Sequence, residues 1–413
     1  MKLKTLTTAI ILATVPMTGA FAAALDRSGQ SIAAFLQPGN YFEAGLSVLD
    51  PTVSGKTNIT ATNPTSQETG DMAGDYYFPS AALKLQLNDN FSVGLIYDQP
   101  FGADAEYTSS NMFTSPLGNT SVEVDTQSLS LIFGFQPTVN WNIYGGGVYQ
   151  TVKGSVELQG TAYSGTASPS TGFAGYKANI DEDGAAGWLA GVAYQIPEIA
   201  LKASLTYRSE IEHTIDVKES SIGTNLTALP VPGLINLNAN KGSTDITTPQ
   251  SVNLDFQTGI MANTVAFANV RWVEWSKFAI RPYAFGKASA AIGPAVGQPN
   301  GFDLVAYSDD QISATVGVGR KLSEQWAGNV SVGWDSGAGN PISTLGPTEG
   351  YWNLGLGAQF SPTPQTFIAG GVKYFWLGDA DAQSGAQFNT PASVAKFEDN
   401  HAIAYGLKMG YKF

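Results

Sequence analysis

The chain has 413 residues, of which 43% are hydrophobic and 13% charged, with a net charge of −13 and no cysteine. An acidic chain argues against nucleic-acid binding, which needs a basic face, and the lack of cysteine excludes disulfides, cysteine metal sites and thiol catalysis. Its 46 glycines, 17 tyrosines and 8 tryptophans suit one large β-structure.

The N-terminus has the pattern of a secretory signal peptide. Lys2 and Lys4 precede a short apolar run at residues 9–15, and Ala20 and Ala22 occupy the small positions of a cleavage site. We therefore expect residues 1–22 to be a signal peptide. No later run of about twenty apolar residues exists, so a helical membrane protein is excluded.

Residues 23–40 precede the first convincing strand. Ser28 is placed to cap a short helix that carries Ile32, Phe35 and Leu36 on one side. One interpretation is a frayed periplasmic tail. The other is an N-terminal plug, or hatch, segment inside the lumen of a barrel.

From residue 41 onward, alternating strands of about ten residues are joined in turn by tight turns and long polar stretches. The tight turns fall at residues 87–91, 136–141, 196–199, 261–264, 321–326 and 361–366. This pattern predicts an all-β fold: a transmembrane antiparallel β-barrel of about 14 strands over residues 41–413, with the short turns on the periplasmic side. We expect the protein in the bacterial outer membrane.

The last thirteen residues show the alternation most clearly. Ile403, Tyr405, Leu407, Met409 and other large apolar residues fall on one face, against small residues and lysines on the other. An unpaired edge in hydrocarbon would leave backbone groups unsatisfied, so we predict that this strand pairs with the first one. Trp141, Trp326, Trp334 and Trp352 stand at strand ends, as an interfacial girdle requires.

Three stretches resemble the FadL family of outer-membrane channels for long-chain fatty acids and other hydrophobic compounds. They are Leu-Thr-Tyr-Arg-Ser-Glu at residues 205–210, residues 270–278, and the closing block 330–413 with Gly-Trp-Asp at 333–335. The likeness runs from about Tyr41 to the end. The family's plug is usually longer and contains an Asn-Pro-Ala element, which residues 23–40 lack.

The resemblance implies passive uptake of hydrophobic small molecules, fatty acids or aromatic hydrocarbons, by a monomer in outer-membrane lipid. We expect no cofactor and no metal, because only His213 and His401 are available as histidine ligands. No serine has a histidine at a plausible separation, so we expect no enzyme activity. Two other functions stay open: a general porin for small hydrophilic solutes, and a surface adhesin or structural barrel.

The third strand contains Pro100, Phe101 and Gly102 after a regular alternation. Proline cannot donate to a strand ladder, so we expect a kink, unless Pro100 only marks the outer end of the strand. The resemblance favours a kink, because family members bend this strand inward and open a lateral window through the wall. Apolar cargo can leave there into the membrane.

The long loop at residues 219–245 carries an aliphatic cluster, Leu229, Val231, Leu234, Ile235 and Leu237. Such a cluster on a loop facing water is either folded onto its neighbours or binds something. The resemblance implies a substrate capture loop. An alkyl chain would gain roughly 0.8 kcal/mol per buried methylene there.

Three cations fall on predicted inward positions: Arg208, Arg271 and Lys202. Each can contact the carboxylate of a fatty acid in the lumen, an arginine better than a lysine because its fork matches two oxygens. Each can equally be held in a lumenal ion pair, Arg208 with Glu210 for instance.

Overall fold

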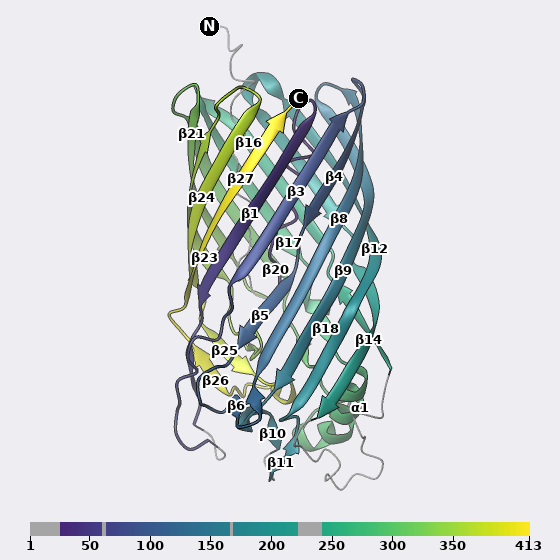
Figure 1. The fold of residues 1–413 in the computed structure, drawn as a ribbon, viewed down its shortest axis with the longest axis vertical. Coiled ribbons are helices and arrows are strands. Elements are labelled where there is room, and N and C mark those ends of the chain that lie inside the picture. The colour runs from purple at the N-terminus through teal and green to yellow at the C-terminus, as the bar shows by residue number, and fades with distance from the viewer. Residues whose placement is uncertain (1–24, 60–62, 166–167, 222–241) are drawn as a thin grey trace.

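The computed structural model describes residues 25–59, 63–165, 168–221 and 242–413. Seventeen strands form one closed antiparallel sheet (Figure 1). Because three positions around the barrel are each occupied by an interrupted strand with two labels, the wall has fourteen strands, as predicted. In chain order they are β1 (Tyr41–Thr52), β3 (Tyr76–Gln86), β4 (Phe91–Asp98) with β5 (Gly102–Glu106), β8 (Ser121–Thr138), β9 (Trp141–Leu158), β12 (Tyr176–Ile196), β13 (Leu201–Arg208) with β14 (Ile211–Ser221), β15 (Ser243–Thr248) with β16 (Ser251–Met261), β17 (Thr264–Val273), β20 (Gln311–Lys321), β21 (Trp326–Asp335), β23 (Tyr351–Phe360), β24 (Thr366–Leu377) and β27 (His401–Lys412).

The last strand closes the barrel. β27 pairs with β1 from Tyr41↔Lys412 to Thr52↔His401 and with β24 on its other side, which confirms the predicted seam. Tyr405 and Met409 on its outer face are 49% and 54% exposed, while Ala402 and Ala404 on its inner face are buried. Large apolar side chains therefore face outward toward lipid, as the membrane requires.

Polarity reverses along the longer strands. On β8, Leu129, Leu131 and Phe133 point outward in the half near the short turns, whereas Glu123 points outward near the long loops, and Val122 and Val124 point inward there. The half with the apolar skin suits the bilayer, and the other half suits water outside with an apolar interior. The wall therefore continues past the membrane as an extracellular extension.

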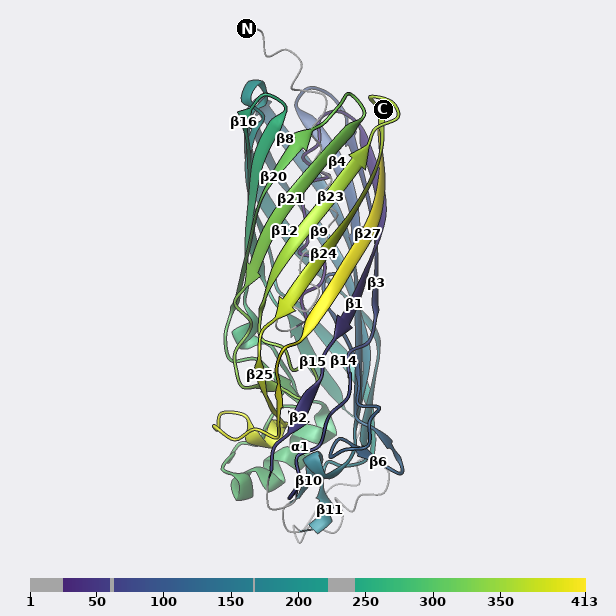
Figure 2. The ribbon, with the colours of Figure 1, turned by 90° about the vertical axis from the view of Figure 1, so that its left-hand side faces the viewer.

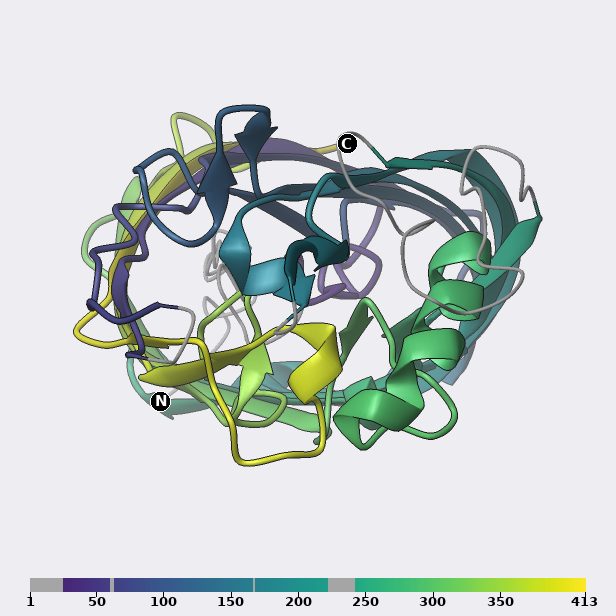
Figure 3. The same ribbon diagram turned by 90° about the horizontal axis from the view of Figure 1, so that it is seen from below.

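The long loops cover the extracellular mouth (Figures 2 and 3). A four-stranded sheet crosses it, made of β2 (Gly55–Thr57), β26 (Ala395–Phe397), β25 (Ala380–Gln383) and β22 (Ile342–Ser343). Helix α1 (Tyr283–Ile292) lies beside it, with the hairpins β6 (Thr114–Ser115)–β7 (Gly118–Asn119) and β10 (Ser164–Gly165)–β11 (Ser168–Gly172) and the antiparallel pair β18 (Ala279–Ile280) and β19 (Val305–Ala306), between which α1 is inserted in the chain. Short 3-10 turns are η2 (Thr161–Tyr163), η3 (Pro197–Ile199), η5 (Trp275–Lys277), η6 (Gly293–Val296) and η7 (Gly385–Gln387).

Among the described residues, no helix is long and apolar enough to cross a membrane. Helix α1 instead packs into the extracellular cap, where the Glu219 carboxylate of β14 accepts the backbone N–H groups of Ala284 and Phe285 at 2.6 and 2.7 Å. A carboxylate at a helix N-terminus satisfies amides that lack partners within the helix. This contact ties α1 to the wall.

Glu349 occupies the loop between β21 and β23, in the extracellular cap. Burial raises the pKa of its carboxyl to about 7, although the backbone N–H of Gly339 donates to Oε1 at 3.2 Å and opposes that shift. Its Oε2 is buried and has no hydrogen-bond partner among the described residues. A protonated carboxyl is therefore favoured at this position below neutral pH.

Candidate functional site

Residues 25–40 lie inside the barrel. Ile32 and Phe35 are 1% exposed and Leu36 is 8% exposed, and the ring of Phe35 packs edge-on against Tyr144 of β9 with centroids 5.7 Å apart. The expected helix is wrong, because the chain here forms successive turns. The Ser28 hydroxyl donates to the Asp98 carboxylate at 2.6 Å, so this side chain is drawn toward the wall.

A buried ion pair fixes the start of this N-terminal segment. Arg271 of β17 donates from Nε and Nη2 to the two oxygens of Asp26, at 2.7 and 3.2 Å, and both side chains are 3% exposed. The same guanidinium donates to Asn253 and Gln30 at 2.8 and 3.0 Å. Such a two-pronged, fully buried contact is among the stronger polar contacts in proteins.

Further side chains of the wall hold the backbone of the segment. Arg208 donates to the carbonyl of Gln30 at 3.1 Å, Asn253 to that of Gly29 at 2.7 Å, and Lys202 to that of Leu36 at 2.7 Å. Lys84 reaches the carbonyls of Gln37 and Gly39, both at 2.9 Å.

The three cations selected from the sequence thus all contact one segment. Arg208 does not pair with Glu210 among the described ion pairs; it donates to Gln30 and, at 3.5 Å, to Ser130. Lys84 and Asn253 also anchor the segment and were not predicted from the sequence. Their inward position in an alternating strand was visible, but their partners on a distant, irregular segment were not.

The third strand is interrupted at Pro100. β4 pairs with β8 up to Asp98↔Ser128, and β5 resumes at Gly102↔Asp125, so three residues of one strand oppose two of the other. The backbone N–H of Phe101 donates to the Thr126 hydroxyl at 2.8 Å, and the same hydroxyl donates to the Phe101 carbonyl at 2.7 Å. This is a bulge, the irregularity that proline favours.

The N-terminal segment forms hydrogen bonds with backbone groups that this bulge leaves without a partner in the sheet. Arg27 donates its N–H to the carbonyl of Pro100 at 2.7 Å, and Gly102 donates to the carbonyl of Leu25 at 2.8 Å. A Cβ on Gly102 would lie 2.1 Å from the guanidinium carbon of Arg27. Any larger residue at position 102 would therefore displace the Arg27 guanidinium.

β3 and the third strand part beside the bulge. Their ladder ends at Ala81↔Tyr97, and the described chain makes its next backbone contact at the bridge Ala73↔Ala105. Between these points β3 pairs only with β1. The Tyr76 hydroxyl spans part of the gap, donating to the Asp104 carbonyl at 2.8 Å, and the Arg27 guanidinium lies 3.9 Å above the Tyr76 ring.

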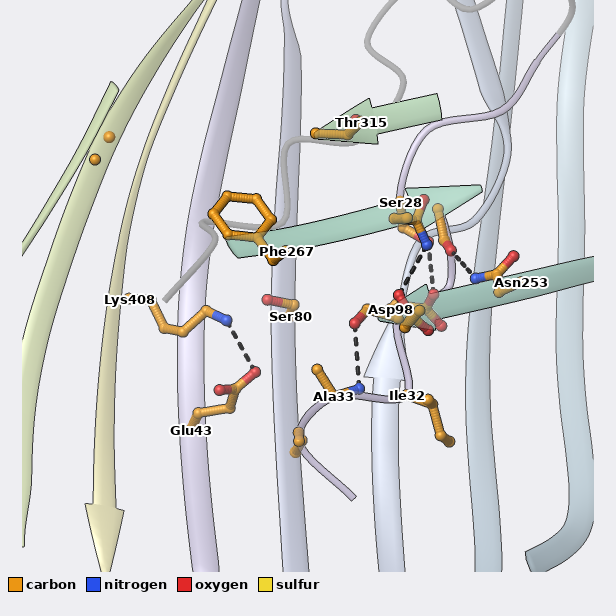
Figure 4. A pocket seen from close by; sticks show the side chains of 18 of the residues that line it. Ser28, Ile32, Ala33, Glu43, Ser80, Asp98, Asn253, Phe267, Thr315 and Lys408 are labelled. Atoms are coloured by element: carbon orange, nitrogen blue, oxygen red, sulfur yellow. Dashed lines mark hydrogen bonds and ion pairs between the residues drawn. The ribbon is translucent and has the colours of Figure 1, made fainter. Parts of the chain in front are cut away.

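A cavity of about 270 Å³ lies between the N-terminal segment and the wall from β13 round to β4, and it reaches this gap (Figure 4). Its wall combines apolar side chains such as Ile32, Phe78 and Phe267 with charged ones. The charged residues are Arg27, Glu43, Asp98, Lys202, Asp255, Lys373 and Lys408. Lys408 is paired with Glu43 at 3.1 Å. The cavity can accommodate an apolar molecule beside a few polar contacts.

Two smaller cavities lie toward the extracellular cap, of about 60 and 20 Å³. They share Leu25, Ile180 and Ile280, and the larger of them shares Arg27 with the main cavity. Arg27 thus stands between an apolar space near the mouth and the space beside the gap in the wall.

Other expected sites fall elsewhere. Leu229, Val231, Leu234, Ile235 and Leu237 lie outside the described residues, as does the expected signal peptide. Within the part of the chain that the structure describes, no group of three or more His, Asp or Glu side chains could hold a metal ion. His213 is fully buried between Asp183 and Gln150, at 3.2 and 3.3 Å.

Comparisons with known proteins agree with this architecture. Residues 22–413 match the model of a family described as outer membrane protein transport protein (OMPP1/FadL/TodX). A FadL homologue from Pseudomonas aeruginosa is similar in structure, with a TM-score of 0.68, 15% identity and 92% of each chain covered. The toluene transporter TodX of Pseudomonas putida aligns with a TM-score of 0.58, 12% identity and 96% of each chain. The toluene transporter TbuX of Ralstonia pickettii aligns with a TM-score of 0.56, 12% identity, 96% of this chain and 98% of that one. No curated protein matches the sequence.

Proposed function

Because the chain belongs to the OMPP1/FadL/TodX family of outer membrane transport proteins, we propose that it takes up small hydrophobic molecules passively and that it is not an enzyme. The observation that carries the proposal is the cavity of about 270 Å³ between the N-terminal segment and the wall, which reaches the gap beside β3. The solved relatives named as toluene transporters and as a FadL homologue have the same fold, which supports aromatic hydrocarbons or fatty acids as cargo.

The proposed path begins at the aliphatic loop residues Leu229, Val231, Leu234, Ile235 and Leu237, which would capture the molecule. From there it runs through the two small apolar cavities, past Arg27 and into the main cavity. The exit is the gap at Pro100, Phe101 and Gly102, a lateral opening into the membrane. An apolar molecule gains by this route because it avoids water throughout.

The N-terminal segment, with Ile32, Phe35 and Leu36 buried in the lumen, is the proposed plug. Apart from the buried pair of Asp26 and Arg271, its contacts with the wall are individually modest, so we expect spontaneous motion to open the path without an energy source. Arg208, Arg271 and Lys202 hold the segment through a carboxylate and backbone carbonyls. A carboxylate on the cargo would compete for the same donors and favour the open state. We expect a monomer surrounded by outer-membrane lipid.

Two measurements together test this function. Purified protein in a planar lipid bilayer should show little steady current, whereas a general porin would show a large one. Cells that make the protein should accumulate labelled oleate or toluene faster than cells that lack it. A large steady current would contradict the proposal, and so would equal accumulation of each probe by cells with and without the protein. If cells that lack the protein grow normally on every hydrophobic carbon source but fail to attach to surfaces, an adhesin would be favoured instead.

A further inference from the structure

The wall contains a second interruption, between β12 and the strand formed by β13 and β14. β12 pairs with β13 as far as Leu189↔Arg208 and with β14 from Ile180↔Val217 onward. Among the described residues, no ladder pair joins residues 181–188 to residues 209–216. Each of these stretches still pairs with its other neighbour, β9 or β15, so the strands are intact and only the seam between them lacks a regular ladder.

Two extra residues on opposite strands explain this slit. The register of β12 against β9 shifts between Ile180 and Asp183. On the facing strand, Arg208 and Ile211 are both buried although two residues separate them, where a regular strand has one. The two irregularities stand at opposite ends of the slit. Between them the strands are out of register by one residue, so the ladder is lost.

The slit lies where the wall leaves the membrane. At the end of the slit nearer the membrane, Trp188 and Tyr207 pack together on the outer surface of the barrel, with ring centroids 5.0 Å apart. Trp188 is 52% exposed. Beyond them the outward positions of β14 are Glu212, Thr214 and Asp216, all exposed. Paired aromatics followed by polar residues mark a membrane interface, so the slit starts at the level of the outer leaflet and its headgroups.

Behind the slit the interior is apolar on both sides of a polar cluster that His213 forms with Asp183 and Gln150. Ile211 and Ile215 are buried at 5% and 1% exposure, and the small cavity lined by Val152, Ile180 and Ile246 lies beside them. That cavity shares Leu25, Ile180 and Ile280 with the next one toward Arg27. A molecule that passed the slit would thus arrive directly on the proposed path.

Side chains, rather than a backbone ladder, close the slit. His213 of β14 lies between Asp183 of β12 and Gln150 of β9, and Thr248 donates to Gln150 at 2.7 Å. Each ladder hydrogen bond of a regular seam contributes about 1 kcal/mol net, and over the slit the regular ladder is lost although the Ser209 N–H still donates to the Trp188 carbonyl at 3.0 Å. Separation of the strands is correspondingly less costly here than in the rest of the wall.

We propose that this slit is a second lateral portal, through which hydrophobic molecules dissolved in the outer leaflet enter the apolar interior on the extracellular side of the N-terminal segment. The inference rests on the proposed uptake function. It assigns the slit to loading and leaves the gap at Pro100 for release. Sideways loading suits a barrel whose mouth is covered by the β2–β26–β25–β22 sheet and α1.

A disulfide staple tests the portal, because the chain has no native cysteine. A Cβ on Gly187 would lie 2.6 Å from Cγ1 of Ile211. The two Cβ atoms of a Gly187→Cys/Ile211→Cys variant therefore fall within about 4 Å, inside the range that a disulfide accepts. The matched control is Val192→Cys/Leu205→Cys, which joins the same two strands at a regular pair that faces outward, away from the main cavity.

The measurement is uptake of labelled oleate and of toluene by cells making each variant, first oxidised and then after a reductant. We expect the oxidised slit staple to lose most uptake, the reductant to restore it, and the control staple to change nothing. Restoration in the same molecules shows that the variant is folded. Equal uptake by the oxidised and reduced slit variant would overturn the portal and leave the proposed function standing. Uptake by neither the wild type nor the reduced variants would overturn the proposed function and the portal with it.

A second variant widens the slit without a cross-link. Ile211→Ala removes the side chain that lies against Gly187, and uptake should become faster than in the wild type. Valine at position 211 is the matched control, because it keeps most of the bulk. Unchanged or slower uptake by a folded Ile211→Ala protein would count against the portal.

Discussion

Loss of the Asp26 carboxylate should open the lumen. Asp26→Ala leaves the Arg271 guanidinium buried at 3% exposure without its anionic partner, and breaking a buried pair in this way costs about 3 to 5 kcal/mol. Arg271 keeps contacts to Asn253 and Gln30, so the lower end of that range applies. About 3 kcal/mol corresponds to about a hundredfold increase in the population in which the N-terminal segment has left its site.

Single-channel recording in a planar bilayer measures this population as the fraction of time spent in a conducting state. The control is Ser31→Ala, an exposed position on the same segment whose hydroxyl accepts only a local N–H. The double variant Asp26→Ala/Arg271→Leu should return part of the way to the closed state, because it no longer buries an unpaired charge. If Asp26→Ala folds and stays as closed as the wild type, the segment is not the plug.

Three further outcomes are expected. Replacing Pro100 and Gly102 together with valine should straighten the third strand and displace Arg27, so uptake of oleate should fall; undiminished uptake would exclude the lateral opening. Replacing Leu234 and Ile235 with aspartate should weaken binding of labelled oleate, and unaltered binding would remove the capture assignment. The raised pKa of Glu349 means that its contribution to the stability of the cap is full below about pH 4.5 and is lost as the pH rises through about 7. Limited proteolysis of the loop at residues 336–350 should therefore become faster from pH 5 to pH 8 in the wild type, and this increase should be smaller in Glu349→Gln.

The alternation of large apolar residues with small or polar ones in the sequence was enough to predict most of the strands of the barrel. The contrast between Met409 outside and Ala404 inside repeats in strand after strand, because lipid selects one face and the lumen the other. The tight turns fixed the strand order, since antiparallel neighbours follow one another along the chain. Both signals are local, and a single sequence carries local signals well.

The reversal of polarity along β8 was not predicted. Val122 and Leu129 are both apolar and lie on opposite faces, so the strand looks like a regular alternation followed by a shift of register. The same pattern fits a bulge that shifts the register and a regular strand that passes from lipid into water. The two can be told apart only when the position of the bilayer surface is known. The same holds for β14, whose buried Ile215 and exposed Asp216 follow the rule for a water-soluble sheet.

The interior of the site was least visible in the sequence. Residues 25–40 have little periodicity, and the expected helix failed because several backbone carbonyls of this segment accept from wall side chains, which leaves only isolated turn bonds such as that from Phe35 to Ile32. The partnership of Asp26 with Arg271 spans 245 residues, and no local pattern encodes a contact at that separation. Pro100 was informative because proline excludes regular pairing whatever surrounds it.

Both interruptions of the wall follow from one physical constraint. A closed barrel must pair every strand in hydrocarbon, because an unsatisfied backbone group there costs several kcal/mol. At Pro100 the freed groups are satisfied by Leu25 and Arg27 of the N-terminal segment, so motion of that segment and opening of the wall are coupled. At the slit, which lies at the interface, water and headgroups can satisfy them instead. The first opening therefore needs the plug to move, whereas the second can open alone, and this difference gives the barrel a loading side and a release side.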